Sequence, residues 1–185
     1  SNESTEKPSA VSSDTAAKDS SPATTAAAGS RDNTPVVLTG SADGTVTYGN
    51  DSVTVDASHT EEGYLMVSYS GSNSKVKLQI TGSDEITYTY NLHDGYETFP
   101  LTSGSGSYTV GVFENIEGTS YSTLFTQAID VTIQDEFGPY LYANQYVNFS
   151  ADSKVISKAM ELSASANDDL EVIENVYNYI ITNFT

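Results

Sequence analysis

Two histidines, His59 and His93, are the only imidazole groups in this 185-residue chain, so any histidine-based acid–base chemistry would have to use them. Both lie in polar, turn-like stretches. The chain has no cysteine, which excludes a thiol nucleophile, disulfides and thiolate metal sites within it. No serine lies in a G-x-S-x-G motif. Because a nucleophile and its base have to be assembled together, we expect both histidines to be ordinary surface residues, and we predict no catalytic residue.

Two adjacent carboxylate pairs, Asp84-Glu85 and Asp135-Glu136, are candidates for calcium ligands. Neither pair lies in a D-x-[DN]-x-[DN]-G loop. Acidic residues are abundant throughout, with 25 Asp+Glu against 7 Lys+Arg and a net charge of −18, and they are more simply explained as a solvated surface. We therefore predict no metal ion and no cofactor. The same charge disfavours nucleic acid and anionic membranes as partners, and no apolar run is long enough to span a bilayer.

Tyrosines provide a third candidate chemistry, because exposed rings can stack on sugars. Four of them fall in register with the apolar faces of strands, which predicts packing in the core: Tyr69, Tyr88, Tyr90 and Tyr108. Tyr64 and Tyr96 do not share that register and are the better candidates for contact with a ligand. Tyr108 also follows a Gly/Ser-rich corner and opens a late strand, which is typical of the tyrosine corner of immunoglobulin-like folds.

The elements that must position these side chains are short strands. From residue 46 to 133 apolar residues alternate every second position, and turn-forming segments recur every eight to twelve residues, which predicts seven to nine strands. Pro100 indicates an edge strand, and the last strand, residues 121 to 133, is expected to bend or bulge near its middle. We predict a mainly β fold, an immunoglobulin-like antiparallel β-sandwich over residues 35–136. The Ser/Thr/Ala-rich residues 1–34 are expected to be a disordered linker.

An aromatic segment follows the sandwich, residues 137–149 with the sequence FGPYLYANQYVNF, which we call the pivot. Beyond it the apolar residues recur every third or fourth position, which predicts two C-terminal α-helices within residues 150–185. The first, from Asp152 to about Ser165, is expected to be capped by Ser150 or Asp152 and to bury a stripe of Val155, Ile156, Ala159, Met160 and Leu162.

The second helix is predicted to begin with a capping box of Asp168 and Glu171. Its apolar residues lie on one wide face that needs a partner: Leu170, Ile173, Val176, Tyr177, Ile180, Ile181 and Phe184. A chain that ends near Asp135 is expected to leave a monomeric sandwich of similar stability.

The segments DEFGPYLYANQYVNFSADSKV and DDLEVIENVYNYIITNFT resemble secreted Firmicute, clostridial-type proteins that carry a transglutaminase-like domain. In that group a linker after a lipoprotein signal precedes a β-sandwich, an aromatic pivot and the helix that opens the papain-like core. Ala143 stands where the family more often has proline. The family's Cys-His-Asp triad has no counterpart in this chain.

The resemblance implies that residues 150–185 are the helical start of a truncated transglutaminase-like domain, and that the catalytic partner domain lies C-terminal to Thr185. The chain opens with Ser1-Asn2 and lacks an initiating Met, so we expect any signal peptide or lipidation site to have been removed. The expected function is that of a non-catalytic accessory module, a spacer and docking platform, in an extracellular protein tethered to the bacterial surface. The alternative is a stand-alone adhesion or carbohydrate-binding module, with a cell-surface protein or a glycan as its partner.

Overall fold

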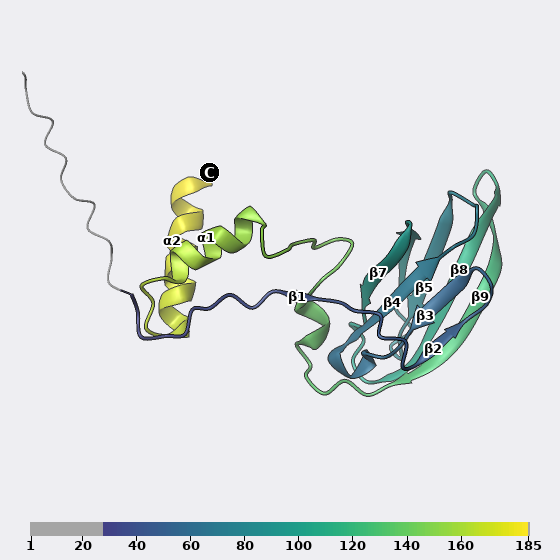
Figure 1. Cartoon of the computed structure of the whole chain (residues 1–185), viewed down its shortest axis with the longest axis horizontal. Coiled ribbons are helices and arrows are strands. Elements are labelled where there is room, and N and C mark those ends of the chain that lie inside the picture. Colours follow the sequence, from purple (N-terminus) through teal and green to yellow (C-terminus); the bar gives the residue numbers. More distant parts are fainter. Residues whose placement is uncertain (1–27, 185) are drawn as a thin grey trace, which may run out of the picture.

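Two antiparallel four-stranded sheets form one end of the computed structural model, which describes residues 28–184 (Figure 1). The first sheet has the order β2-β3-β4-β7, formed by Thr47–Gly49, Val53–Asp56, Tyr64–Tyr69 and Gly95–Pro100. The second has the order β6-β5-β8-β9, formed by Thr87–Leu92, Val76–Thr81, Gly106–Glu117 and Ser120–Val131. The predicted mainly β, antiparallel sandwich is confirmed, and Pro100 lies on an edge strand as expected.

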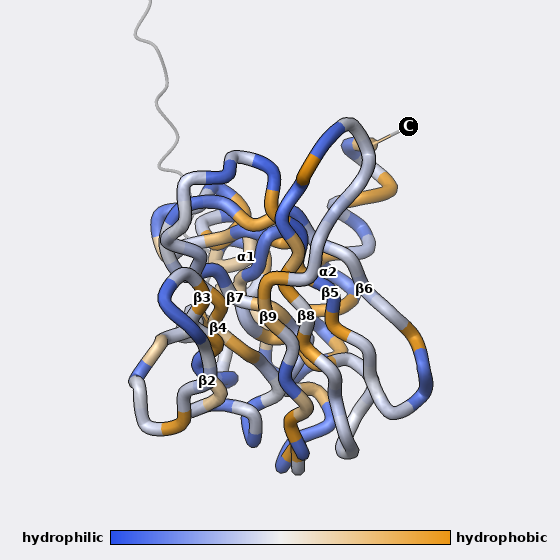
Figure 2. Tube along the Cα trace, turned by 90° about the vertical axis from the view of Figure 1, so that its right-hand side faces the viewer, coloured by the Kyte–Doolittle hydropathy of each residue, from blue (hydrophilic) through white to orange (hydrophobic). Residues whose placement is uncertain are grey.

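The core lies between the sheets and follows the alternation in the sequence. On β5, Val76, Leu78 and Ile80 are buried, whereas Lys77 and Gln79 between them are half-buried. Figure 2 shows the same change between hydrophobic and hydrophilic positions along β8 and β9. The largest fully buried apolar side chains of the core come from both sheets and the loop after β7: Tyr108, Phe99, Leu65, Leu78, Leu101, Val53, Val55, Val67, Val110 and Val112.

A bulge interrupts the longest pairing, between β8 and β9, near the middle of β9. Val112 pairs with Phe125, but the next residue, Phe113, pairs with Thr123, so Leu124 is left without an opposite residue. An extra residue on one strand bends it and increases its twist. The predicted bulge is therefore confirmed.

The pivot adds a small third layer to the sandwich. It begins with a 3-10 turn, η2 (Gly138–Tyr140), and continues into β10 (Tyr142–Ala143). β10 pairs in parallel with β1 (Leu38–Thr39), which comes from the other end of the chain. Another 3-10 turn, η1 (Thr60–Glu62), precedes β4. The pivot is thus a docked part of the β structure.

Two α-helices follow, and Figure 1 shows both lying away from the sandwich. α1 spans Lys154–Ser163 and begins later than predicted; its N-cap position is Ser153, in place of Ser150 or Asp152. The expected buried stripe of α1 is wrong, because Val155, Ala159 and Met160 are exposed and Ile156 and Leu162 are only half-buried.

α2 spans Asp169–Asn183 and begins with the predicted cap. The Asp168 Oδ1 atom accepts a hydrogen bond from Glu171 N at 2.9 Å. The Glu171 carboxylate in turn accepts from Asn167 N at 2.7 Å, one residue earlier than in a standard capping box. No helix within residues 28–184 has the length and apolar character needed to cross a membrane.

The described part of the predicted linker, residues 28–34, lies beside the turn between the two helices. Gly29 N donates to Ala164 O at 3.0 Å, and Arg31 Nε donates to Asp169 Oδ1 at 2.7 Å. Two segments therefore connect the helices with the sandwich, one before β1 and one after β10. Residues 1–27 of the predicted linker lie outside the described residues.

Candidate functional site

Contacts between the pivot and the outer face of the first sheet bring together most of the residues that could take part in catalysis or binding. The ring of Tyr142 lies 4.5 Å from that of Tyr64, centroid to centroid, and its hydroxyl donates to Glu62 Oε2 at 3.2 Å. Burial, together with the charge of Glu62, raises the pKa of Tyr142 to about 12. Gly63 permits this approach, since a Cβ at this residue would lie 2.5 Å from Pro139 and its φ is +90°. We call this contact the pivot seam.

His59 is the centre of a polar cluster at the pivot seam. Its Nδ1 atom is 3.0 Å from Glu62 Oε2, and its Nε2 atom is 2.9 Å from Asp43 Oδ2 and 3.1 Å from Ser41 Oγ. The imidazole also stacks on Tyr64, with 5.2 Å between the ring centroids and 11° between their planes. The His59 side chain is only 20% exposed, so the expectation of an ordinary surface histidine is wrong for this residue.

Ser41, His59 and Glu62 form a hydrogen-bonded series of serine, histidine and carboxylate. A nucleophile, its base and an orienting acid are linked in the same way in a catalytic triad. Asp43, however, is closer to Nε2 than the serine is. Asp43 and Ser41 therefore compete for the same ring nitrogen, and the four side chains form one hydrogen-bonded network, which we call the His59 cluster.

A second cluster joins the pivot to the edge strand β7. Gln145 Nε2 donates to Glu97 Oε1 at 2.9 Å and to Asn91 O at 2.7 Å, and His93 N donates to Glu97 Oε2 at 2.7 Å. Burial alone would raise the pKa of the Glu97 carboxyl, but these hydrogen bonds from His93 and Gln145 outweigh it and lower the pKa. The His93 side chain is 66% exposed, as predicted for a surface histidine.

The two carboxylate pairs have structural roles in turns. Asp84 Oδ1 accepts from Ile86 N at 3.1 Å, and Asp135 Oδ1 accepts from Phe137 N at 3.0 Å. Within the described residues, no three His, Cys, Asp or Glu side chains are grouped so that they could hold a metal ion. The pairs carry turn-fixing bonds of the kind that Asp commonly makes.

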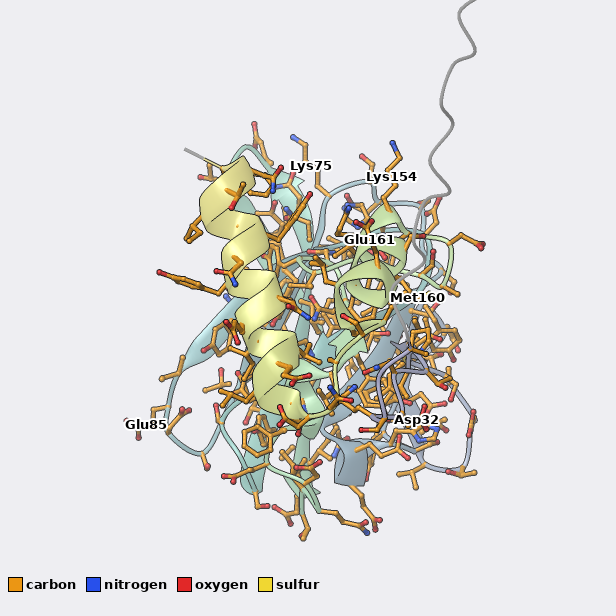
Figure 3. All side chains as sticks on the ribbon, turned by 90° about the vertical axis from the view of Figure 1, so that its left-hand side faces the viewer. Asp32, Lys75, Glu85, Lys154, Met160 and Glu161 are labelled. Carbon is orange, nitrogen blue, oxygen red and sulfur yellow. The ribbon has the colours of Figure 1, made fainter. Side chains whose placement is uncertain are left out.

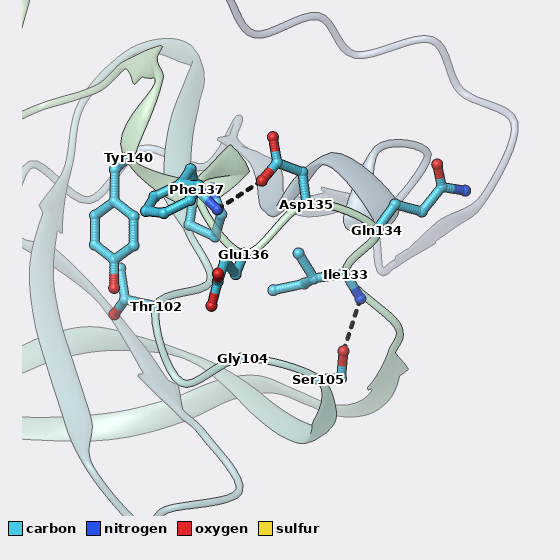
Figure 4. Close-up of a pocket in the computed structure, with 10 residues that line it drawn as sticks. Thr102, Gly104, Ser105, Ile133, Gln134, Asp135, Glu136, Phe137 and Tyr140 are labelled. Carbon is cyan, nitrogen blue, oxygen red and sulfur yellow. Dashed lines mark hydrogen bonds between the residues drawn. The ribbon is translucent and has the colours of Figure 1, made fainter.

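A cavity of about 690 Å³ lies between the β7–β8 loop and the start of the pivot (Figure 4). The rings of Phe137 and Tyr140 line it and are 63% and 65% exposed. Polar groups around the cavity already form hydrogen bonds with each other. Phe137 N donates to the Asp135 carboxylate, and Ile133 N donates to Ser105 Oγ at 2.9 Å. The cavity contains no assembled nucleophile and base.

The tyrosines expected in the core are found there with one exception. Tyr69, Tyr90 and Tyr108 are buried, but Tyr88 is 43% exposed near the start of the edge strand β6. Tyr64 is only 2% exposed, because His59 and Tyr142 cover its ring, so its prediction as a ligand contact is wrong. Tyr96 is 46% exposed and remains a candidate for ligand contact.

The sequence patterns missed the Ser41–Asp43–His59–Glu62 cluster and the Glu97–Gln145 bond. Gln145 lies 48 residues from Glu97, and neither residue belongs to a known motif. The single available signal was the polar His59–Glu62 spacing of three residues, which suits one helical turn. Comparison of the chain with protein-family models, with curated proteins and with solved structures found no match.

Proposed function

We propose that this chain is a non-catalytic accessory module, a spacer and docking platform, of a secreted or cell-surface protein with a transglutaminase-like domain. The observation that carries the proposal is the apolar face of α2, which is exposed. Figure 3 presents α2 at the front of the molecule, beside α1. Six large apolar side chains on it are 50% to 72% exposed: Leu170, Ile173, Tyr177, Ile180, Ile181 and Phe184. We call these six residues the α2 apolar face.

α1 does not cover the α2 apolar face, because it packs against another side of α2. On that side Val172 and Val176 are half-buried, and Asn175 Nδ2 donates to Leu162 O at 2.9 Å. Burying one large apolar side chain stabilises a structure by ~1.5–3 kcal/mol. Covering six exposed ones would therefore strongly favour association with a partner. Contiguous apolar patches on soluble proteins commonly mark interaction sites.

The proposed occupant of the α2 apolar face is the catalytic domain that the family resemblance implies after Thr185. The resemblance also supports an extracellular location and tethering to the bacterial surface. In this arrangement the sandwich holds the catalytic domain away from the surface, and α2 is the joint between them.

The immunoglobulin-like assignment of the sandwich is part of the proposal. It is supported by the strand order. In the first sheet β4 pairs with β7. In the second sheet β5 lies between β6 and β8, and β9 pairs with the other side of β8. This is the relation of strands B and E, and of C′, C, F and G, in immunoglobulin-like domains. The Tyr108 hydroxyl also donates to Gly104 O at 2.7 Å, four residues upstream, as in a tyrosine corner.

Charge substitutions on the α2 apolar face test the docking function. We expect the double substitution Ile173→Glu and Ile180→Glu to change the unfolding free energy of this chain by less than about 0.5 kcal/mol, because both residues are exposed. In a protein extended through the transglutaminase-like domain, the same pair should lower the melting temperature clearly. The control is Val155→Glu on α1, which is 62% exposed and outside the face. Equal melting temperatures for the extended wild-type and double-variant proteins would contradict the docking function.

The proposal also predicts that this chain lacks acyl-transfer activity. The geometry at His59 supports this, since Asp43 Oδ2 lies 2.9 Å from Nε2 and competes with Ser41 Oγ at 3.1 Å. Incubation with a glutamine-containing peptide and a primary amine should give background rates. Turnover that copurifies with the protein and is lost on Ser41→Ala would refute the non-catalytic assignment.

A further inference from the structure

A groove of about 440 Å³ runs along the outer face of the first sheet, where the cover provided by the pivot ends. Its floor consists of Met66, Tyr96 and Thr98. One wall is formed by five pivot residues: Ala143, Asn144, Gln145, Asn148 and Phe149. Small-molecule sites in proteins have volumes of roughly 300–1,000 Å³, so the groove has a suitable size. It is separate from the α2 apolar face and from the His59 cluster.

Tyr96 presents a flat, accessible ring in this groove. The side chain is 46% exposed, and its hydroxyl has no hydrogen-bond partner among residues 28–184. β7 holds the residue in place through its pairing with β4, where Tyr96 lies opposite Ser68. A tyrosine on a paired strand is a rigid surface with one apolar face and one polar end.

The polar groups around the ring are neutral and partly free. The Asn148 side chain is exposed and has no hydrogen-bond partner within the described part of the chain, and the Thr39 hydroxyl is likewise exposed. Gln145 is fixed by its bonds to Asn91 O and Glu97, so its remaining amide oxygen is held in position. These groups offer hydrogen-bond donors and acceptors without net charge.

Charged residues are scarce in the lining, although the chain has 25 acidic residues. Glu97 is the one charged residue that lines the groove in the described structure, and its two oxygens already accept from His93 N and Gln145 Nε2. An anionic ligand would therefore lose its hydration and meet only the like charge of Glu97, and a cationic ligand would find both oxygens of that carboxylate already bonded. A purely apolar ligand would leave the amide and hydroxyl groups unpaired.

We propose that this groove binds a neutral saccharide, whose pyranose ring stacks on Tyr96 while its hydroxyl groups bond to Asn148, Thr39 and the Gln145 oxygen. This inference does not depend on the accessory function or on α2. It extends that function by giving the sandwich a ligand of its own.

Saturation-transfer NMR with the whole chain tests the proposal. The probes are neutral tetrasaccharides of glucose, mannose, xylose and N-acetylglucosamine, with a cationic glucosamine tetramer and an anionic galacturonate tetramer as charge controls. We expect at least one neutral probe to bind. Tyr96→Ala should weaken that binding by roughly tenfold, equal to ~1.4 kcal/mol, and Tyr96→Phe should retain most of it because the ring remains.

Tyr88→Ala is the matched control, since Tyr88 is 43% exposed but lies on β6 outside the groove. It should leave the affinity unchanged. The proposal is overturned if no neutral probe binds, if Tyr96→Ala and Tyr88→Ala have equal effects, or if only the cationic tetramer binds and salt abolishes its signal. Chemical-shift changes confined to the groove would support the site, whereas changes confined to α2 would contradict it.

Discussion

At the scale of single residues, Tyr108 stabilises one end of the sandwich. It is 1% exposed, and its hydroxyl donates to Gly104 O at 2.7 Å, which ties the β7–β8 loop to the start of β8. We predict that Tyr108→Phe lowers the unfolding free energy by about 1 kcal/mol, the net value of one such hydrogen bond. Urea unfolding measures this difference. The control is Tyr88→Phe, whose exposed hydroxyl has no partner among residues 28–184; equal effects of the two substitutions would contradict the role of the bond.

Asp56 makes stability depend on pH. It is 2% exposed, and burial alone would raise the pKa of its carboxyl. Hydrogen bonds from Ser58 and from Gly44 N outweigh burial and hold the pKa below the ordinary value. The folded carboxyl therefore releases its proton more readily than the unfolded one, and its stabilisation is present above the unfolded pKa of about 3.9 and is lost as the pH falls through the folded pKa.

We predict that the unfolding free energy of the wild type falls more steeply between pH 5 and pH 3 than that of Asp56→Asn, which has no proton to gain at this position. Urea unfolding at several pH values provides both slopes. Parallel slopes would mean that Asp56 does not contribute to the acid sensitivity.

At the scale of elements, the pivot is part of the sandwich fold. The ring of Tyr142 packs at a tilt against Tyr64 and its hydroxyl bonds to Glu62, and Tyr146 packs at a tilt against Tyr90 with 5.5 Å between the ring centroids. Removing the pivot would expose Tyr64, which is 2% exposed in the structure. The sequence-based expectation of an equally stable chain ending near Asp135 is therefore replaced by the opposite one.

We predict that Tyr142→Ala lowers the unfolding free energy by about 2 kcal/mol, because it leaves a gap over Tyr64. Tyr140→Ala, in the same segment, should change it by less than about 0.5 kcal/mol, since Tyr140 is 65% exposed. Chains ending at residue 135 should unfold at lower urea concentrations than chains ending at residue 150. If these two chains have equal midpoints, the pivot does not stabilise the sandwich.

The strands were predictable because their core residues alternate locally, as Val76, Leu78 and Ile80 do on β5. The third layer was not, because β1 and β10 are two residues long and are about a hundred residues apart, so neither has a detectable period. The burial of Tyr64 depends on that distant pairing. Tyr88 shows the opposite case, since its register is that of the core but it lies near the start of an edge strand, where no neighbour covers it.

At the scale of the whole molecule, the helices and the sandwich are joined by two segments. The first segment precedes β1 and starts beside the α1–α2 turn, where Arg31 pairs with Asp169. The second segment follows β10 and leads to α1 (Figure 1). Two connections restrict relative motion more than one does. This arrangement holds α2 at a distance from the sandwich (Figure 1).

Hydrogen exchange of the amides from Val176 to Ile181 is the most direct test of the docking account. It is measured on this chain and on a protein extended beyond Thr185 through the proposed transglutaminase-like domain. The account predicts fast exchange in this chain, where the α2 apolar face is exposed, and exchange at least about tenfold slower in the extended protein, where docking should prevent local opening. Equal exchange rates in the two proteins would show that α2 is not the joint between the domains, and would contradict the account.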